Sequence, residues 1–316
     1  MRFVFLFLTW LLLFSSCKQE KPRLELLEVK VLSDYPSGSA SCFQKGHLVI
    51  MGDDAADLLL LDSVWKNVKR VNMFPFESKR IPKEIKADIE AATWFKDKNE
   101  TGILMLGSGS TPTRNTGFIV QPLGNSKRSF GLDTFYNRLQ QAGISPLNIE
   151  GLAQIPGWFV IACRGNMSFK KNHLVFVRNR FWEKQATVSF HVSRLGITIP
   201  GENFSGVSGL DYSYRTDRLF ITSSTEHTGS AYEDGEIGKS YLSIVNSMNR
   251  MINYEAINPF EIIDLEGFDE RFRGAKVESV SIISENKHQT QLALVADNDN
   301  GKTTVFKIAL NHKKPD

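Results

Sequence analysis

The sequence has few of the residues and spacings that mark catalytic and metal sites. Only three of its 316 residues are cysteine, and its six histidines have none of the paired spacings of tetrahedral zinc sites. Residues 238–240, Gly-Lys-Ser, resemble the end of a phosphate-binding loop, but Glu233 stands where that loop needs a glycine. Residues 206–210 lack the last glycine of a nucleophile elbow. The sequence therefore contains no recognisable catalytic signature.

Neither sign of charge is in large excess. The 38 lysines and arginines against 35 acidic residues leave a formal charge of +3, which does not favour a polyanionic partner such as nucleic acid. With 41% hydrophobic and 23% charged residues, the chain has the composition of a globular protein with a sizeable core. We therefore expect a folded monomer that does not bind nucleic acid.

The apolar run at the N-terminus is shorter than an ordinary membrane span of about 20 residues. It covers residues 3–14, follows a basic residue and precedes two serines, as in a secretory signal peptide. Cys17 comes next, so residues 14–17 resemble the lipobox of bacterial lipoproteins, with Phe14 in place of the usual leucine. This pattern predicts a signal peptide that ends before a lipidated cysteine.

The expected division of the chain follows from that N-terminus. Residues 1–16 are a lipoprotein signal peptide, residues 17–23 are a charged tether, and residues 24–316 form one domain. Acyl chains on Cys17 would anchor the protein firmly, because each buried methylene contributes about 0.8 kcal/mol. The expected location is the cell envelope, anchored to the outer membrane on its periplasmic or its cell-surface side. The alternative is ordinary signal cleavage, which leaves Cys17 unmodified.

A repeated unit organises the rest of the chain. Its clearest copy covers residues 149–179 and contains three short apolar runs separated by turn residues. Similar units open at Ser39, Glu90, Glu150, Ser208 and Glu278, so the successive spacings are 51, 60, 58 and 70 residues. Repeats of this length are typical of architectures in which one unit cannot bury its apolar face alone.

The repeats predict an all-β fold, a five-bladed β-propeller. The first four units have material for a fourth strand and the last has none, whereas residues 24–32 form an apolar run with no unit of their own. We therefore expect this N-terminal strand to close the ring as the outer strand of the last blade. Six blades are the alternative if residues 246–275 form a degenerate blade, and an array of β-sandwiches is the structural rival. Residues 133–142 predict a short helix.

Two cysteines and three tryptophans fall within or beside the expected strands. Cys42 and Cys163 belong to the first and third units, which is too great a separation for the Cα distance of roughly 4.4 to 6.8 Å in a disulfide. We expect both to be buried free thiols. Trp94, Trp158 and Trp182 are expected to pack between blades more than to form sugar-binding platforms.

Polar residues gather on one face of the expected propeller. Antiparallel order places the starts of the first strands and the loops between the second and third strands on the same side. The candidate ligand-binding residues on this side are Glu90, Glu150, Arg164, Asn166, Glu226 and Glu278. The alternative is a structural duty, in which an acidic residue of each repeat binds backbone N–H groups of the neighbouring blade. Residues 224–239 form the longest of these loops, either a lid or a solvated excursion.

Several acidic residues on the same face predict a possible cofactor, calcium, because hard cations take several oxygen ligands. The candidate ligands are Asp53, Asp54, Asp297 and Asp299. Residues 297–301 resemble the start of a calcium loop. The alternative is a hairpin turn, for which the Asn-Gly pair at 300–301 is a strong signal.

Four motifs carry a resemblance to known propellers. They are residues 149–152 (IEGL), 208–211 (SGLD), 277–280 (VESV) and 296–299 (ADND). The mature chain resembles an uncharacterised family of bacterial lipoprotein β-propellers and, more distantly, phytase-like and SdiA-regulated-type extracytoplasmic propellers. The complete propeller plan, the lipoprotein signal and the missing catalytic set predict a membrane-anchored propeller that binds a small molecule or a protein on its polar face. The alternative, which the resemblance to phytase-like propellers implies, is a calcium-dependent, phytase-like or esterase-like hydrolase, in which Arg164 holds the anionic group.

Overall fold

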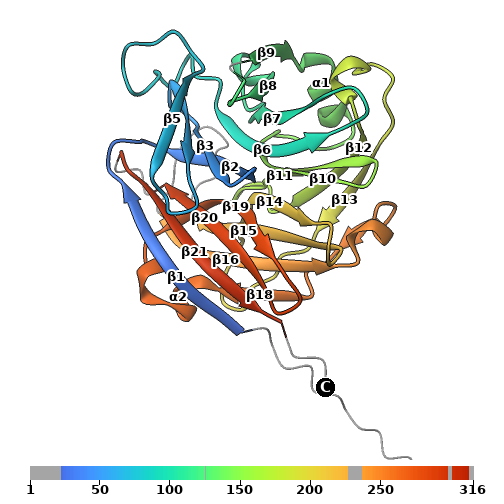
Figure 1. Cartoon of the computed structure of the whole chain (residues 1–316). Helices are drawn as coiled ribbons and strands as arrows, with labels where there is room; N and C mark the ends of the chain where they lie inside the picture. The colour runs from blue at the N-terminus through green and yellow to red at the C-terminus, as the bar shows by residue number, and fades with distance from the viewer. Residues whose placement is uncertain (1–22, 125, 227–236, 298–300, 313–316) are drawn as a thin grey trace, which may run out of the picture.

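Five small sheets, antiparallel except for one added parallel strand, form a ring in the computed structural model, which describes residues 23–124, 126–226, 237–297 and 301–312 (Figure 1). The first blade contains β2 (Gly38–Gln44), β3 (His47–Gly52), β4 (Asp57–Leu61) and β5 (Asn67–Asn72). The second contains β6 (Ile89–Lys96), β7 (Thr101–Gly107), β8 (Thr116–Gln121) and β9 (Ser126–Gly131). The third contains β10 (Ile149–Ile155), β11 (Trp158–Cys163), β12 (Asn172–Arg178), β13 (Phe190–Leu195) and the added strand β17 (Ala256–Ile257).

Of the last two blades, only the fifth contains strands from both ends of the chain. The fourth contains β14 (Gly206–Ser213), β15 (Arg218–Glu226), β16 (Ile237–Asn246) and β18 (Glu261–Asp264). The fifth contains β19 (Lys276–Glu285), β20 (Gln289–Asp297), β21 (Thr303–Asn311) and, as its outer strand, β1 (Arg23–Leu32). The first strands β2, β6, β10, β14 and β19 pack side by side in a closed ring. The five-bladed propeller predicted from the repeats is therefore confirmed.

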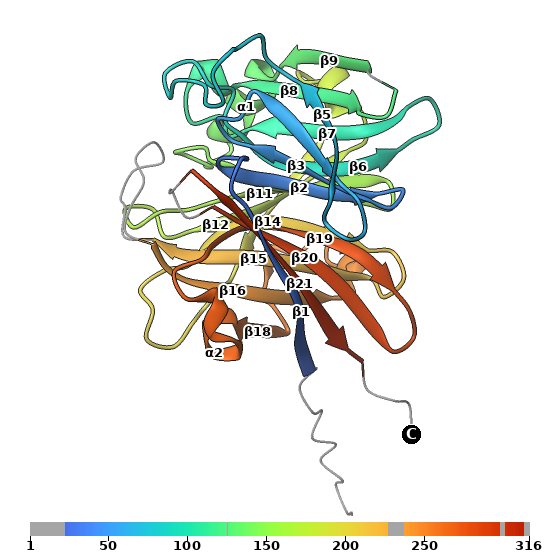
Figure 2. The ribbon, with the colours of Figure 1, turned by 60° about the vertical axis from the view of Figure 1, so that its left-hand side comes forward.

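The N-terminal strand closes the ring as predicted. β1 pairs antiparallel with β21, from Leu24 opposite Leu310 to Leu32 opposite Thr303. Figure 2 shows the two strands side by side, with the start of β1 and the end of β21 on the same side of the molecule. The six-blade alternative is wrong, because the chain between β16 and β19 contributes β17 to the third blade and β18 to the fourth.

Five apolar clusters, one for each interface between neighbouring blades, form the core. In β3, Leu48 and Ile50 face the fifth blade, whereas Val49 and Met51 face the second. Successive side chains of a strand point to opposite faces of its sheet. The second strand of each blade therefore contains a continuous apolar run in the sequence, because neighbouring blades cover both faces of its sheet. Cys42 and Cys163 are free thiols in two of these clusters, as predicted.

Helices are short and lie outside the sheets. α1 (Asp133–Gln141) matches the predicted helix and buries Phe135, Tyr136 and Leu139 against the interface of the second and third blades. α2 (Leu265–Phe268) follows β18. Four 3₁₀ turns complete the elements: η1 (Pro112–Arg114), η2 (Phe181–Glu183), η3 (Met248–Arg250) and η4 (Glu270–Phe272). Among the described residues, no helix has the length and apolar character that crossing a membrane requires.

Candidate functional site

Each inner strand contains a β-bulge near its start. One residue of the strand is skipped where it pairs with the second strand of its blade, and the skipped residues are Ser39, Glu90, Glu150, Ser208 and Glu278. A bulge leaves its extra residue outside the hydrogen-bond ladder and redirects the side chain. We call these five residues the bulge ring and the side on which they lie the bulge face. They are the five unit openings that the repeat spacing predicts.

The two serines of the bulge ring connect neighbouring blades. The Ser39 hydroxyl donates a hydrogen bond to Glu90 Oε2, which joins the first blade to the second. Ser208 Oγ donates to the backbone carbonyl oxygen of Val277 at 2.6 Å, which joins the fourth blade to the fifth. The small members of the ring therefore contribute to the contact between blades.

Two of the glutamates have polar partners in their own strand or just before it. Glu150 Oε1 accepts a hydrogen bond from Asn148 Nδ2 at 2.6 Å, and Glu278 Oε1 lies 3.0 Å from Lys276 Nζ. Both glutamates are less than a tenth exposed. Burial strengthens these interactions, because the local dielectric constant is lower than that of water.

Glu90 is the member of the ring with the most perturbed ionisation. Its pKa is raised well above the ordinary value, first because the side chain is buried and then because negative carboxylates surround it. These carboxylates belong, in order of effect, to Asp88, Glu150, Asp53 and Glu278. Glu90 therefore keeps its proton at pH values where an exposed glutamate is ionised.

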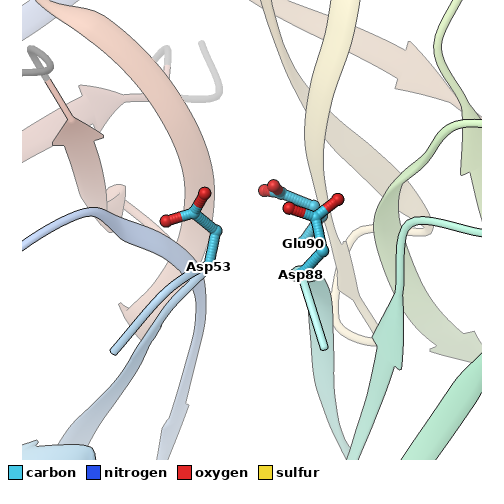
Figure 3. Close-up of side chains that lie close together, drawn as sticks. All are labelled: Asp53, Asp88 and Glu90. Carbon is cyan, nitrogen blue, oxygen red and sulfur yellow. The ribbon is translucent and has the colours of Figure 1, made fainter. Parts of the chain in front are cut away.

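Three acidic side chains from two blades meet beside the ring. Figure 3 shows Asp88 and Glu90, at the start of the second blade, opposite Asp53, which directly follows β3. Carboxylate oxygens of the three residues lie within 4.8 Å of one another, a spacing that can hold a metal ion. Of these residues, Asp53 was predicted as a calcium ligand and Glu90 as a ligand-binding residue, whereas Asp88 lies just outside the repeat unit.

Two buried cations neutralise this acidic group. The Lys86 ammonium contacts the carboxylates of both Asp53 and Asp88, and lies 2.8 Å from Asp88 Oδ1. The Arg114 guanidinium lies 2.7 Å from Asp88 Oδ2. The lysine and arginine side chains are only 9% and 3% exposed, so both charges depend on these carboxylates for compensation. Sequence patterns do not single out either cation, because both lie in loops between the strands.

The ionisation of this group reflects opposing effects. Burial raises the pKa of Asp53 to about 6, although the Lys86 ammonium acts in the opposite direction. Burial lowers the pKa of Lys86, but the negative charges of Asp53, Asp88 and Glu90 outweigh it and leave the pKa above its ordinary value. Lys86 is therefore a firmly charged ammonium held among carboxylates.

The other predicted calcium ligands are placed differently. Asp54 is buried beside the acidic group, and its Oδ2 accepts a hydrogen bond from Arg80 Nε at 2.6 Å. Asp297 is buried at the end of β20 and acts electrostatically on Arg80. Asp299 lies outside the described residues. Both carboxylates act to raise the pKa of Arg80, Asp54 by direct contact and Asp297 through its charge.

The remaining predicted ligand-binding residues do not join the ring. Arg164 donates hydrogen bonds to Ser224 Oγ at 3.1 Å and to the carbonyl oxygen of Val207 at 3.4 Å, which ties the third blade to the fourth. Asn166 Oδ1 accepts from backbone N–H groups two and three residues later and so shapes its own turn. The side chain of Glu226 lies outside the described residues.

The sequence matches a family model over residues 34–310, and the family is described as a family of unknown function, DUF6929. The chain belongs to this family. A comparison with curated proteins finds no match to the chain. Membership therefore accounts for nearly the whole propeller and assigns no activity to it.

A comparison with solved structures finds similar chains at low sequence identity. The glutaminyl cyclase of Myxococcus xanthus is 9% identical, with a TM-score of 0.52 over 93% of this chain and 99% of that chain. A PQQ-bound aldose sugar dehydrogenase from Streptomyces coelicolor is 11% identical, with a TM-score of 0.41 over 91% and 98%. A member of the DUF4221 family from Bacteroides vulgatus is 10% identical, with a TM-score of 0.35 over 92% and 99%. At these identities, the likeness to the cyclase shows the fold alone.

Proposed function

We propose that this propeller binds a small organic cation, an amine or guanidine, at the bulge ring. The observation that carries the proposal is the set of five bulges, which bring three glutamates and two serines to one end of the inner strands. A bulge adds strain and removes a residue from the ladder, so five equivalent bulges around polar side chains favour a role in recognition. The Lys86 ammonium already forms ion pairs with Asp53 and Asp88, which supports the binding of a positively charged amine by carboxylates in this region.

Glu90 is the proposed receptor for the cation. Among the described residues, no lysine, arginine or histidine nitrogen lies within ion-pair distance of its carboxylate, whereas Asp53, Asp88 and Glu278 each have such a partner. A cation bound beside Glu90 would replace the proton that the surrounding negative charge now retains. Binding and proton release are therefore expected to be coupled.

Calorimetric titration at several pH values tests this coupling. With putrescine and agmatine as probes, affinity is expected to rise with pH by up to about tenfold per pH unit while Glu90 is protonated in the free protein. Heats measured in buffers of different ionisation enthalpy count the released proton. Glu90→Gln is expected to abolish the proton release and to weaken binding, whereas Asp269→Asn, at an exposed ion pair with Arg271, leaves both unchanged.

Three outcomes would contradict amine binding at Glu90. Absence of amine binding at millimolar concentration throughout the titrated range overturns the proposal, as does binding whose affinity and proton count are the same in Glu90→Gln. Turnover of carboxylic or phosphate esters that Glu150→Ala abolishes would replace the binding function by an enzymatic one.

A calcium-dependent hydrolase is the second candidate. The observation in its favour is the spacing of Asp53, Asp88 and Glu90, together with Asp53 Oδ1, which is buried without a hydrogen-bond partner among the described residues. Calcium there would polarise a substrate oxygen and activate a bound water. The difficulty is that the Lys86 ammonium already contacts two of the three carboxylates.

Melting experiments separate calcium from the amine. Calcium at a hundred times its Kd is expected to add about 2.7 kcal/mol to the stability of a protein that binds it only in the native state. Lys86→Met removes the competing ammonium, so calcium is expected to stabilise this variant more than the unaltered protein. If millimolar calcium shifts neither melting temperature, the calcium hypothesis is rejected, while the amine titration remains a separate test.

The proposed setting is the cell envelope. The signal-like residues 1–16 and the cysteine that follows support a lipid anchor on Cys17 in the outer membrane. We further propose that the propeller is a monomer and that its ligand is a small molecule or a protein segment with a basic group. Mass spectrometry of the envelope-extracted protein is expected to show acylation at Cys17. Cys17→Ser is expected to release the protein from the membrane fraction, and release without acylation in the unaltered protein contradicts the anchor.

A further inference from the structure

A pocket of about 110 Å³ lies between the first and second blades, at the end of the strands opposite the bulge ring. Its lining includes the turn that joins β2 to β3, the end of β6 and the end of β8. We call the side with these first hairpin turns the hairpin face and this cavity the Trp94 pocket. It shares no residue with the bulge ring, so it stands independently of the function proposed above.

The pocket combines an apolar floor with an aromatic wall. Val49, Leu60 and Ile103 are almost fully buried and form apolar lining. Trp94, on β6, is partly exposed and lines the same space. A tryptophan ring that borders a cavity offers a large flat face for another ring, a contact that contributes about 0.5–1.5 kcal/mol beyond the buried area.

Positive groups and neutral amides supply the polar part of the lining. Lys45 Nζ lies 5.7 Å from the centroid of the Trp94 ring, and His47 lies on the same turn. Lys69, which is outside the lining, donates from Nζ to the carbonyl oxygen of the lining residue Pro122 at 2.9 Å. Among the described residues that line the pocket, none is aspartate or glutamate. An anionic ligand therefore fits the local charge, and a cationic one would be repelled.

We propose that the Trp94 pocket binds a small ring compound that carries a carboxylate. The ring would stack on Trp94 above the apolar floor, and the carboxylate would pair with the Lys45 ammonium. The pocket is smaller than the cavity of about 150 Å³ that encloses a benzene molecule, so we expect the ring to lie on Trp94 only partly inside the pocket, with the carboxylate outside it. The exposed Lys45 side chain, now over the ring, exchanges a weak cation–π contact for a charge-assisted hydrogen bond.

The turn that carries the lysine provides a clean variant. Lys45 has φ of 50° and Gly46 has φ of 80°, so both central residues of this two-residue turn are in the left-handed region. Asparagine suits the first position of such a turn better than most residues do. Lys45→Asn therefore removes the ammonium and preserves the hairpin. Lys98→Asn, at another exposed lysine on the hairpin face, makes the same change of charge outside the pocket.

Fluorine NMR of fluorotryptophan-labelled mature protein tests the proposal with benzoate and glucuronate as probes. Trp94→Phe assigns the Trp94 resonance, which is expected to move on titration while the other tryptophan resonances stay in place. Lys45→Asn is expected to weaken binding by tenfold or more, and Lys98→Asn to leave it unchanged. Benzyl alcohol and methyl glucoside, which lack the carboxylate, are expected to bind at least tenfold more weakly than the matching acids.

The two probes identify the source of the ring. A response to benzoate alone supports an aromatic acid, a response to glucuronate alone supports a sugar acid, and a response to both supports the carboxylated ring as the shared feature. The proposal is overturned if neither acid moves the Trp94 resonance at millimolar concentration. It is also overturned if Lys45→Asn binds the acids as well as the Lys98→Asn control does.

Discussion

The bulge ring and the Trp94 pocket lie at opposite ends of the same strands, and they hold their charges in opposite ways. Beside the ring, Lys86, Asp88 and Arg114 are each less than a tenth exposed and compensate one another. At the pocket, Lys45 is exposed on a turn. Buried charges cannot be removed singly without a large cost in stability, whereas exposed ones can. Substitution of a charged residue on the bulge face is therefore expected to lower the stability of the fold. Substitution of an exposed charged residue on the hairpin face is expected to leave stability nearly unchanged.

Removing the closing strand is expected to have the largest effect, because it disturbs both ends of the blades at once. Leu24 and Leu32 of β1 are buried, and each buried leucine contributes about 1.5–3 kcal/mol. Deletion of residues 1–32 is therefore expected to cost roughly 3–6 kcal/mol relative to deletion of residues 1–21. Thermal melting of the two proteins measures the difference, and equal melting temperatures would reject the closing strand.

A substitution at each end sharpens the contrast in charge burial. Arg114→Ala leaves the buried Asp88 carboxylate without one of its partners and is expected to cost about 3–5 kcal/mol. Lys45→Asn is expected to stay within about 0.5 kcal/mol. Urea unfolding measures both, with Arg271→Ala, at the exposed pair with Asp269, as a control expected to cost less than about 1 kcal/mol. Similar losses of unfolding free energy for Arg114→Ala and Lys45→Asn would contradict the difference in charge burial between the two faces.

The smallest expected effect is a pH dependence that comes from the inner strands. Burial raises the pKa of Asp211 on β14 to about 7, even though the backbone N–H groups of Ile282 and Tyr212 donate to its carboxylate. The folded pKa exceeds the unfolded value of about 3.9, so the folded state binds the proton more strongly. Its contribution to stability is complete below about pH 4 and is lost as pH rises through about 7. Asp53, with a pKa of about 6, acts in the same direction.

Variants locate that pH dependence. Stability measured by urea unfolding is expected to fall between pH 5 and pH 8 by less in Asp211→Asn than in the unaltered protein. The substitution is expected to lower stability at every pH by about 1–3 kcal/mol, because an NH₂ group then faces a backbone N–H donor. Lys45→Asn, which alters no buried carboxyl, is expected to keep the full slope. An unchanged slope in Asp211→Asn would assign the effect to other groups.

The repeat pattern was sufficient to predict the blades, the closing strand and the members of the bulge ring. Strand spacing carries that information, because each unit must place its inner strand at the same radius and its opening on the same face. The loops contain no such period. Lys86 and Arg114 come from segments of unequal length between strands, so their approach to Asp88 depends on contacts that sequence spacing does not encode. The same reason explains why the predicted calcium ligands reach different partners.

The Trp94 pocket was also outside what the sequence could indicate. A tryptophan near the end of a strand favours packing between blades, and Trp94, Trp158 and Trp182 each pack against such a cluster, as predicted. Trp94 remains partly exposed because the turn at Lys45 and the end of β8 leave a gap beside it. Such a gap is a property of two neighbouring blades and not of either segment alone.

The pairing of β1 determines on which face of the propeller the N-terminal segment joins the fold. Arg23 lies opposite Asn311, and Leu32 lies opposite Thr303, so the chain enters at the end of the fifth blade away from the bulge ring. Residues 17–22 can span at most about 20 Å when fully extended. With a lipid on Cys17, as proposed above, the hairpin face and the Trp94 pocket would stay close to the bilayer. The carboxylates of the bulge ring would open toward the aqueous compartment and sample ligands that arrive from solution.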